Sequence, residues 1–522
     1  MSYVEGANRE QVMLFPRAID DYIEAENPVR FMEVFVNQLE LAELGFSKAE
    51  AKDRGRPAYD PRDLLKLYLY GYMNEVSSSR KLERETIRNV EVMWLLRRLT
   101  PDHKTIANFR KDNAAVLPKV FREFSKVCRQ LNLFGAELVG IDGSKFRASN
   151  GKDSNFNQAK LKQRLQWLEE KIARYLAALA AADESDGEGA RESAAKLAEK
   201  LAALEKRKIE YEGLQQQLVA SGEKQLSLTD SEARLMKSRQ GQHVSYNVQI
   251  AVDSKHKLIA DFAVTNEAND VNCLAALAQG AQAELGVKEL KVCADRGYYN
   301  TAQIKQCEEA GIEVHMDRPE RPRPAGIFPL EQFSYDEAQD VYFCPAGERL
   351  KFRLLDKKKQ VRCYWTEACR RCPLKSQCTR GQGPRKIKRP LGQAAADRML
   401  QRVAANREFL QLRKQLVEHP FGTIKRQMKR DHFLLRGQLK VTAETSLTLL
   451  AYNFKRVLKL LGVAKLIAAL ALQNAESAVN RVAECLLLWQ RSVRQQSLRQ
   501  NPAFSLLCVG ATFISVNSLS NV

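Results

Sequence analysis

The feature that most constrains the fold is a short apolar run that leads directly into a carboxylate. Residues 138–150 read LVGIDGSKFRASN, in which strand-forming side chains precede Asp142 and a glycine stands close on either side of it. Residues 290–299 (LKVCADRGYY) repeat this pattern with Asp295. We therefore expect two buried strands that each end by presenting an aspartate.

A third acid, Glu418, lies in a strongly basic segment, 411–430 (QLRKQLVEHPFGTIKRQMKR). Clustered carboxylates are the ligands that Mg²⁺ and Mn²⁺ prefer, and two such ions about 3.5–4 Å apart can activate a nucleophile and stabilise the leaving oxygen of a phosphodiester. A lone aspartate at a strand end is usually a cap or turn residue, but three acids in one fold beside a basic helix favour a metal site. We expect Asp142 to bridge two Mg²⁺ (or Mn²⁺) ions, with Asp295 and Glu418 each completing one coordination sphere.

Basic residues flank Glu418 along the same segment. Lys414 lies four residues before it and Lys425 seven after, so on a continuous helix all three share a face and both ammonium groups can reach phosphates. Pro420 complicates this prediction, because it cannot donate to the carbonyl of Leu416 and should kink or restart the helix. A solvated charged helix is the alternative.

The charge balance points to a polyanionic partner. A net charge of +20 on 522 residues is most often a sign of nucleic acid binding and less often of an anionic membrane surface, with a merely basic soluble enzyme as the alternative. The apolar stretch 504–516 is shorter than the ~20 residues of a membrane helix, and the polar residues 1–10 do not resemble a signal peptide, so we expect no membrane partner. Eleven cysteines without a secretion signal favour reduced thiols in the cytoplasm.

The order of predicted elements indicates an α/β fold. After one long insertion is set aside, the order is strand, strand, strand, helix, strand, helix, strand, over residues 138–142, 243–253, 258–265, 269–285, 290–294, 301–310 and 312–316. This is the order of a ribonuclease H-like core, a mixed sheet flanked by helices with the first two acids on neighbouring strands.

Changes in composition divide the rest of the chain. Leucines at helical spacing in 151–239 predict an architectural helical hairpin or a coiled coil that pairs two chains. The expected organisation is an all-helical DNA-binding domain (1–130), the ribonuclease H-like core (135–150 and 240–318), the hairpin insertion (151–239), a Cys-rich basic insertion (319–395), C-terminal core helices with Glu418 (396–462) and a tail of unassigned role (463–522).

The N-terminal region offers several helix starts. Asp60 is a suitable N-cap and Pro61 a good first residue, which predicts a helix over 61–73. A later helix is expected to begin at Thr100 and to gather basic residues up to 113. Short capped helices with basic residues suit a helix-turn-helix DNA reader, although a helical packing or dimerisation domain fits equally well.

Five cysteines lie in the predicted basic insertion. Cys369 and Cys372 have the spacing of a zinc-ligand pair, and Cys378 and Cys344 can complete a four-thiolate site, with Cys363 as a substitute for Cys344. Zinc would then hold a basic DNA-binding subdomain together without taking part in cleavage. Free thiols are the alternative, because only one such pair is present.

Several motifs together match a known family. The segments GIDGSKFRA, SYNVQIAVD, VTNEANDV, CADRGYYN, VEHPFGTIKR and AETSLTLLAYNFKRVL, in this order with the cysteine cluster, closely resemble bacterial DDE insertion-sequence transposases. The resemblance is to the insertion-sequence-4/5 superfamily and its insertion-sequence-1182 branch, over roughly residues 10–462. It implies Asp142, Asp295 and Glu418 as the catalytic triad, behind an N-terminal DNA-binding region.

The match around the glutamate is incomplete. The superfamily has Tyr and Arg where this chain has Gln411 and Lys414, whereas Glu418 and Lys425 fit the pattern. Lysine cannot clamp a phosphate bidentately as arginine does, so Arg413 is a candidate replacement.

The expected DNA contacts are basic side chains and one aromatic ring. Tyr298 or Tyr299 could stack a base, although packing is the favoured role for either. The full set of expected DNA-contacting residues is Arg413, Lys414, Lys425, Arg426 and Tyr298.

These expectations describe a bacterial, nucleoid-associated DNA transposase. It would bind the terminal inverted repeats of its element as a homodimer or higher oligomer, cleave double-stranded DNA with two metal ions and join the freed ends to target DNA. The alternatives are a non-catalytic DNA-binding regulator derived from a transposase, and a ribonuclease H-like nuclease without strand transfer.

Overall fold

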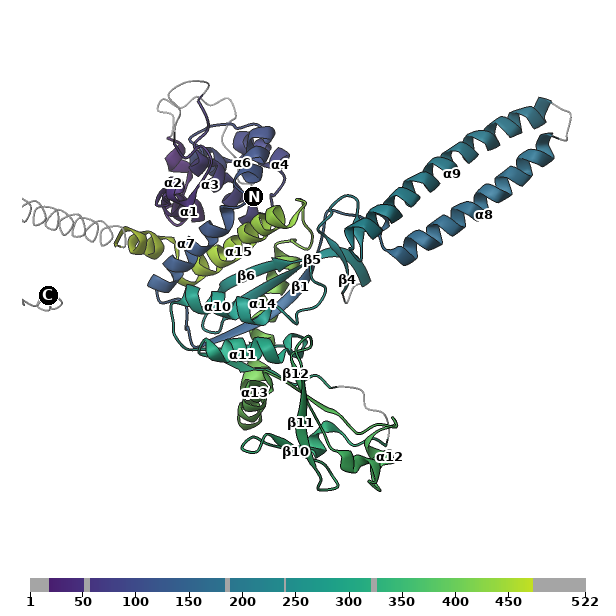
Figure 1. Cartoon of the computed structure of the whole chain (residues 1–522). Helices are drawn as coiled ribbons and strands as arrows, with labels where there is room; N and C mark the ends of the chain where they lie inside the picture. Colours follow the sequence, from purple (N-terminus) through teal and green to yellow (C-terminus); the bar gives the residue numbers. More distant parts are fainter. Residues whose placement is uncertain (1–17, 51–56, 184–187, 239–240, 321–325, 473–522) are drawn as a thin grey trace, which may run out of the picture.

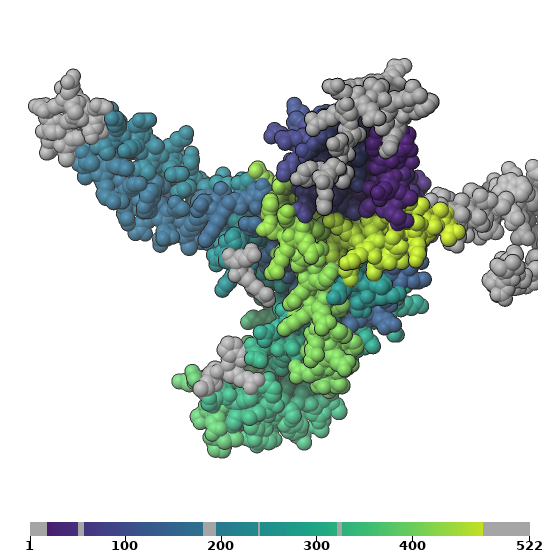
Figure 2. All heavy atoms as spheres, turned by 180° about the vertical axis from the view of Figure 1, so that it is seen from behind, coloured from purple at the N-terminus to yellow at the C-terminus, as the bar shows by residue number. Residues whose placement is uncertain are grey.

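The computed structural model describes residues 18–50, 57–183, 188–238, 241–320 and 326–472. A central sheet with helices on both faces forms the body (Figure 1). N-terminal helices lie on one side of this body, a long two-helix arm projects from it, and a second sheet lies at the opposite end (Figure 1). Seen from behind, the arm and the second sheet extend in different directions (Figure 2). The α/β class predicted from the sequence is confirmed.

The central sheet is mixed. Its strands follow the order β4-β5-β1-β7-β8, and β6 also pairs with β5. Strand β1 is antiparallel to β5 but parallel to β7, which is parallel to β8. The bounds are β1 (Leu138–Arg147), β4 (Arg234–Ser238), β5 (Gly241–Asp253), β6 (Ile259–Thr265), β7 (Leu290–Ala294) and β8 (Ile312–His315).

Helices cover both faces of this sheet. Gly140 on β1 faces α14 (Glu408–Gly422), where a Cβ would lie 3.1 Å from Val417 Cγ1. Strand β6 presents Asp261 from the other face to Gly280 of α10 (Leu274–Leu285). Two further helices, α11 (Thr301–Glu309) and α13 (Gln393–Ala405), pack against each other near β8. None of the helices in the described segments is long and apolar enough to cross a membrane.

The N-terminal helices share one core with the C-terminal helix α15 (Gln438–Leu461). The rings of Phe31, Phe35, Phe124 and Phe454 meet with centroids 4.7–6.5 Å apart. The N-terminal region therefore packs directly on the C-terminal part of the chain. Its helices are η1 (Ile19–Tyr22), α1 (Pro28–Asn37), α2 (Leu41–Leu44), α3 (Pro61–Met73), α4 (Ser79–Arg88), α5 (Val90–Leu95), α6 (His103–Asp112) and α7 (Leu117–Gln130).

Local capping chemistry sets these helix starts. Helix α3 begins at Pro61 as predicted, and the Asp60 side chain accepts a hydrogen bond from the amide of Arg62 (2.8 Å). The predicted start at Thr100 is wrong. Helix α6 begins at His103, because the Asp102 carboxylate caps it.

The arm is a pair of long helices. Its helices α8 (Gln158–Asp183) and α9 (Glu188–Ser221) pack along each other, and the short η2 (Lys152–Ser154) precedes it. At its base, β2 (Asn155–Phe156) pairs with β3 (Leu226–Ser227). A small apolar cluster of Phe156, Leu161 and Leu218 holds this base together.

The second sheet is antiparallel, in the order β13-β12-β11-β10-β9. Among the described residues, its own hydrophobic cluster has five buried members: Phe333, Tyr342, Leu350, Tyr364 and Ile387. The elements are η4 (Leu330–Gln332), β9 (Ser334–Asp336), β10 (Val341–Phe343), β11 (Arg349–Asp356), β12 (Val361–Trp365), η5 (Glu367–Arg370), α12 (Lys375–Cys378) and β13 (Ile387–Pro390).

Gly71 provides a test of the N-terminal packing. A Cβ at Gly71 of α3 would lie 2.2 Å from the carbonyl oxygen of Val76 and 2.6 Å from Leu82 Cδ2. Because a backbone atom cannot yield as a side chain does, Gly71→Ala should lower the free energy of unfolding by about 2–3 kcal/mol. Thermal and urea unfolding measure this change.

Gly213→Ala in α9 is the matched control, since nothing lies within 4 Å of its Cβ position. It should stabilise helix α9 by up to about 1 kcal/mol. Equal effects of the two substitutions would contradict the close approach at Gly71.

Candidate active site

Asp142 lies inside a strand and not at its end. The predicted strand end at Asp142 is wrong, because β5 pairs with β1 continuously from Val139 to Arg147. The neighbour on the other side, β7, pairs only as far as Ile141, opposite Ala294. Asp142 is therefore the first residue of β1 beyond the end of β7, where that edge of β1 is left open.

Asp295 directly follows the last residue of β7. It caps the short helix η3 (Arg296–Tyr298), accepting a hydrogen bond from the amide of Arg296 (2.7 Å), and its side chain is exposed. Since Ile141 and Ala294 are partners in the parallel ladder, Asp142 and Asp295 come next on adjacent strands. The structure thus brings together the two acids that begin the predicted triad.

The electrostatics of Asp142 reflect this crowding. The pKa of its carboxyl is raised to about 6, chiefly by burial; the Gly143 amide and Arg413 act to lower it, and the nearby carboxylates of Asp295 and Asp270 add to the rise. The Gly143 amide donates to Asp142 Oδ1 (2.8 Å), and Arg413 Nη1 lies 3.6 Å from Asp142 Oδ2. The negative charges of neighbouring carboxylates at this position favour the binding of a cation.

Glu418 is not gathered with the two aspartates. It lies exposed on α14, one residue beyond Val417, which packs on Gly140. It makes no hydrogen bond or ion pair that the structure records. Within the described segments, no three or more His, Cys, Asp or Glu side chains are close enough to hold a metal ion, and this applies to Asp142, Asp295 and Glu418 together.

The basic residues of this segment separate into different positions. Arg413, and not Lys414, faces Asp142, because α14 turns the side of Arg413 and Val417 toward β1. Lys414 and Arg426 are exposed. These positions place the guanidinium of Arg413 beside Asp142.

Lys425, expected to reach DNA phosphates, is half-buried and bonded to β1 in this structure. Its ammonium donates to Ser144 Oγ (2.6 Å) and to the carbonyl of Lys145 (2.8 Å), and lies 4.4 Å from the Phe146 ring. Burial lowers the pKa of this lysine to about 8. Helix α14 passes through Pro420 without the predicted restart, and the π-helical turn Thr423–Gln427 follows, which changes the helical register and turns Lys425 inward.

Tyr298 is also buried. Its side chain is 1% exposed and its hydroxyl donates to Gln249 Oε1. The base-stacking contact expected of Tyr298 is not available in this conformation, whereas the alternative packing role agrees with it.

The sequence reasoning missed Asp270. This residue follows β6 in the segment VTNEANDV, and its carboxylate accepts hydrogen bonds from two buried amides of β5. An acid in a loop that follows a strand of the same sheet was the available signal. Spacing alone could not distinguish it from the other acid of that loop, Glu267.

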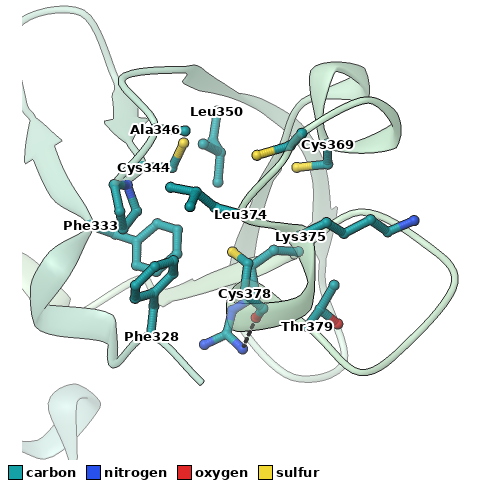
Figure 3. Close-up of a pocket in the computed structure, with 13 residues that line it drawn as sticks. Phe328, Phe333, Cys344, Ala346, Leu350, Cys369, Leu374, Lys375, Cys378 and Thr379 are labelled. Carbon is teal, nitrogen blue, oxygen red and sulfur yellow. Dashed lines mark hydrogen bonds between the residues drawn. The ribbon is translucent and has the colours of Figure 1, made fainter. Parts of the chain in front are cut away.

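Four cysteines of the second sheet line one cavity of about 20 Å³, room for about one water-sized particle. They are Cys344, Cys369, Cys372 and Cys378. Figure 3 shows Cys344, Cys369 and Cys378 around this cavity, together with Phe333 and Leu374. Burial raises the pKa of the Cys378 thiol, and the other three thiols raise it further. Cys363 is buried on β12 and does not line the cavity.

A second cavity, of about 440 Å³, opens at the far end of β1. Its polar lining is Arg147, Asn150, Lys152, His243 and His432. Arg147 is itself paired with Asp431. The cavity is a cationic groove five residues along β1 from Asp142.

Comparison with known families decides the class of protein. Residues 17–112 match a family described as a transposase domain (DUF772), and residues 343–458 match the transposase DDE domain family. The chain is a DDE transposase. No curated protein and no solved structure matches it. Arg413, Glu418 and the four cysteines lie inside the matched DDE segment, whereas Asp142 and Asp295 precede it.

Gly140 tests the contact that places Arg413. A Cβ there would lie 3.1 Å from Val417 Cγ1 and 3.2 Å from Leu416 Cβ, so Gly140→Ala must push α14 away by a few tenths of an ångström. We expect a loss of about 1–2 kcal/mol in the free energy of unfolding. We also expect a several-fold fall in DNA cleavage by the transposase, because Arg413 moves relative to Asp142.

Val417→Ala in the same chain should restore part of both losses, since it removes Cγ1. Gly422→Ala is the control within the same helix, because nothing lies within 4 Å of its Cβ position. Thermal unfolding and a nicking assay measure the effects. A Gly140→Ala protein as stable and active as wild type would disprove the close contact.

Proposed function

We propose that the transposase binds the terminal inverted repeats of its own insertion sequence and catalyses metal-dependent strand cleavage and strand transfer. The observation that carries this proposal is the pair of acids on adjacent strands, Asp142 and Asp295, beside the guanidinium of Arg413. It agrees with the two transposase families that the chain matches.

The sheet supports a ribonuclease H-like core. The order β6-β5-β1-β7-β8, with β5 antiparallel and β7 parallel to β1, is a mixed sheet whose central strand carries the first acid. Helix α14, from later in the chain, covers the face of that strand which carries Asp142. In this proposal the arm and the second sheet are insertions, and the N-terminal helices form a DNA-binding domain packed on α15.

The carboxylates at this site supply two of the three ligands proposed for a divalent cation. Two carboxylates close enough to raise the pKa of one of them form a site that a cation stabilises, and Asp142 and Asp295 would hold it. Glu418 is the proposed third ligand. Its exposed carboxylate joins the others only after α14 or the acidic side chains move, since the three are not grouped here. Bound Mg²⁺ or Mn²⁺ would supply activation of the attacking oxygen and stabilisation of the leaving one.

The protein's own groups position the DNA strand. The Gly143 amide fixes one oxygen of Asp142 and leaves the other toward Arg413. Arg413 is the only cation recorded in contact with Asp142 among the described residues, and its planar guanidinium suits bidentate binding of a phosphate oxygen pair. We propose that Arg413 leaves Asp142 and binds the scissile phosphate when a metal ion occupies the acids.

Basic residues around the site extend this surface. From 370 to 440 the chain has nineteen Lys and Arg residues against four acids, which suits the phosphates of double-stranded DNA. Lys414 and Arg426 are exposed there, and the cationic groove at Arg147 and Lys152 continues the surface along β1. Lys425 supports β1 from within and is not proposed as a DNA contact.

The arm supports pairing of two chains. Large apolar side chains along it are exposed to solvent: Trp167, Leu176, Ile209 and Val219 are between 41% and 69% exposed. Two copies that join these faces would form a helical bundle on DNA. The free thiols among the described cysteines agree with a cytoplasmic location.

The function is tested with labelled DNA that carries the inverted repeats flanking the gene for this chain. With Mg²⁺ and a target plasmid, wild type should nick the repeat ends and join them to the plasmid. Asp142→Ala should lower both activities by about 1,000-fold or more. Asp356→Ala, which removes a strand-end aspartate in the second sheet, is the matched control and should cleave normally.

Each outcome distinguishes the candidate functions. Nicking without joined products would make the protein a nuclease without strand transfer. Equal nicking by wild type and Asp142→Ala would remove Asp142 from the mechanism. Specific binding of the repeats without any cleavage would support a regulator.

We further propose that the four cysteines hold a structural zinc ion. Their convergence on one cavity supports this, as does the small core of the second sheet, which needs an additional constraint. In this structure the four thiols are not close enough together to hold one metal ion: the described segments contain no group of three or more His, Cys, Asp or Glu side chains that could do so. Binding must therefore draw them together around the cavity.

Zinc content tests this assignment. The purified transposase should contain about one Zn²⁺ per chain, and Cys372→Ser should lose it and lower the melting temperature. Cys363→Ser is the control and should keep its zinc, because Cys363 lies outside the cavity. A wild-type protein with four reactive thiols in this cavity and no zinc would refute the site.

A further inference from the structure

Asp270 lies where the segments that carry Asp142 and Asp295 come together. Its Oδ1 accepts hydrogen bonds from Asn247 Nδ2 (2.7 Å) and Gln249 Nε2 (2.6 Å), and Lys145 Nζ lies 3.5 Å away. Lys145 belongs to β1, the strand of Asp142. Asp270 is thus bonded to both strands of the longest ladder in the sheet.

The network continues to the segment of Asp295. Gln249 uses its other end to accept from the hydroxyl of Tyr298, three residues after Asp295. Gln249 and Asn247 are fully buried and Tyr298 is 1% exposed, so these bonds are shielded from water. A buried amide that lost its acceptor would cost about 1–3 kcal/mol, which makes the arrangement sensitive to each member.

Two glycines show how closely Asp270 approaches the backbone. A Cβ at Gly143, next to Asp142, would lie 2.9 Å from Asp270 Oδ1 and 2.3 Å from Gln249 Nε2. A Cβ at Gly297, two residues after Asp295, would lie 4.0 Å from Asp270 Oδ2. The Asp270 carboxylate therefore sits against the backbone beside both acids.

Asp270 is on the opposite face of β1 from Asp142. Gly143 and Lys145 point toward Asp270, whereas Gly140 and Asp142 point toward α14. The hydrogen-bond partners of Asp270 all lie on the core side of β1. Among the described residues, Asp270 belongs to no group of three side chains that could hold a metal ion. This placement suits a group that acts through its neighbours and not as a ligand.

We propose that Asp270 is a positioning residue of the transposase active site, which fixes Asp295 relative to Asp142 through Gln249, Tyr298 and Lys145. The inference rests on the proposed function, since it assumes that the two aspartates bind the catalytic ions. Its acceptor oxygen holds the two amides of β5, and one of them, Gln249, holds the turn that follows Asp295 through Tyr298.

The test compares the Mg²⁺ concentration for half-maximal nicking among variants of the full chain. Asp270→Ala removes the acceptor, so this concentration should rise about 10- to 100-fold, the usual effect of losing a group that orients metal ligands. Asp270→Asn keeps an acceptor oxygen and should bring the value back to within about threefold of wild type. Tyr298→Phe should give an intermediate rise.

Asp230→Ala is the matched control. Asp230 is also a buried acid that accepts from a tyrosine, Tyr246, and from the Gly437 amide, but it belongs to the loop before β4. Its loss should lower the melting temperature and leave the Mg²⁺ requirement unchanged. Binding of repeat DNA without metal, measured for every variant, reports whether the fold is retained.

The results separate this inference from the proposed function. An unchanged Mg²⁺ requirement in Asp270→Ala, with active wild type and inactive Asp142→Ala, would overturn the inference alone. Asp270→Asn as defective as Asp270→Ala would also overturn it, because the charge and not the acceptor would then matter. If wild type itself does not cleave, the proposed function fails first.

Discussion

The candidate site depends on the unequal lengths of the two ladders that flank β1. Strand β5 follows β1 to Arg147, whereas β7 leaves it after Ile141. Backbone hydrogen bonds to β5 therefore hold Asp142 rigidly from one side, while the other side is open to solvent and to Asp295. A rigid strand with one free edge can present a carboxylate to a large ligand without exposing the core.

A second constraint is the charge around that opening. Asp142 lies near Asp295 and the guanidinium of Arg413, with Asp270 on the opposite face of β1, and burial, more than the neighbouring carboxylates, disfavours the charged form of Asp142. The arrangement is tolerable because each carboxylate has a specific partner: Arg413 and the Gly143 amide for Asp142, the Arg296 amide for Asp295, and Lys145 with two amides for Asp270.

Part of the fold and of the candidate site could be predicted from the sequence, because it depends on interactions between residues that are close along the chain. Pro61 and its cap Asp60 fixed α3, and the apolar runs before Asp142 and Asp295 located β1 and β7, because these signals act between neighbours in sequence. The continuation of β1 beyond Asp142 depends on β5, about a hundred residues away. The inward turn of Lys425 depends on a π-helical turn, and Asp270 depends on partners from two strands. Such long-range pairings leave no trace in spacing.

The way the arm joins the body has a consequence for how chains of this kind vary. Its two connections form a ladder in which Asn155 pairs with Ser227 and Phe156 with Leu226, so the entering and leaving backbones are separated only by the spacing of paired strands, about 5 Å. A segment attached at such adjacent points can lengthen, shorten or be exchanged for a tight turn while β1 and β5 keep their places. Evolution can therefore alter the reach of the arm independently of the chemistry at its root.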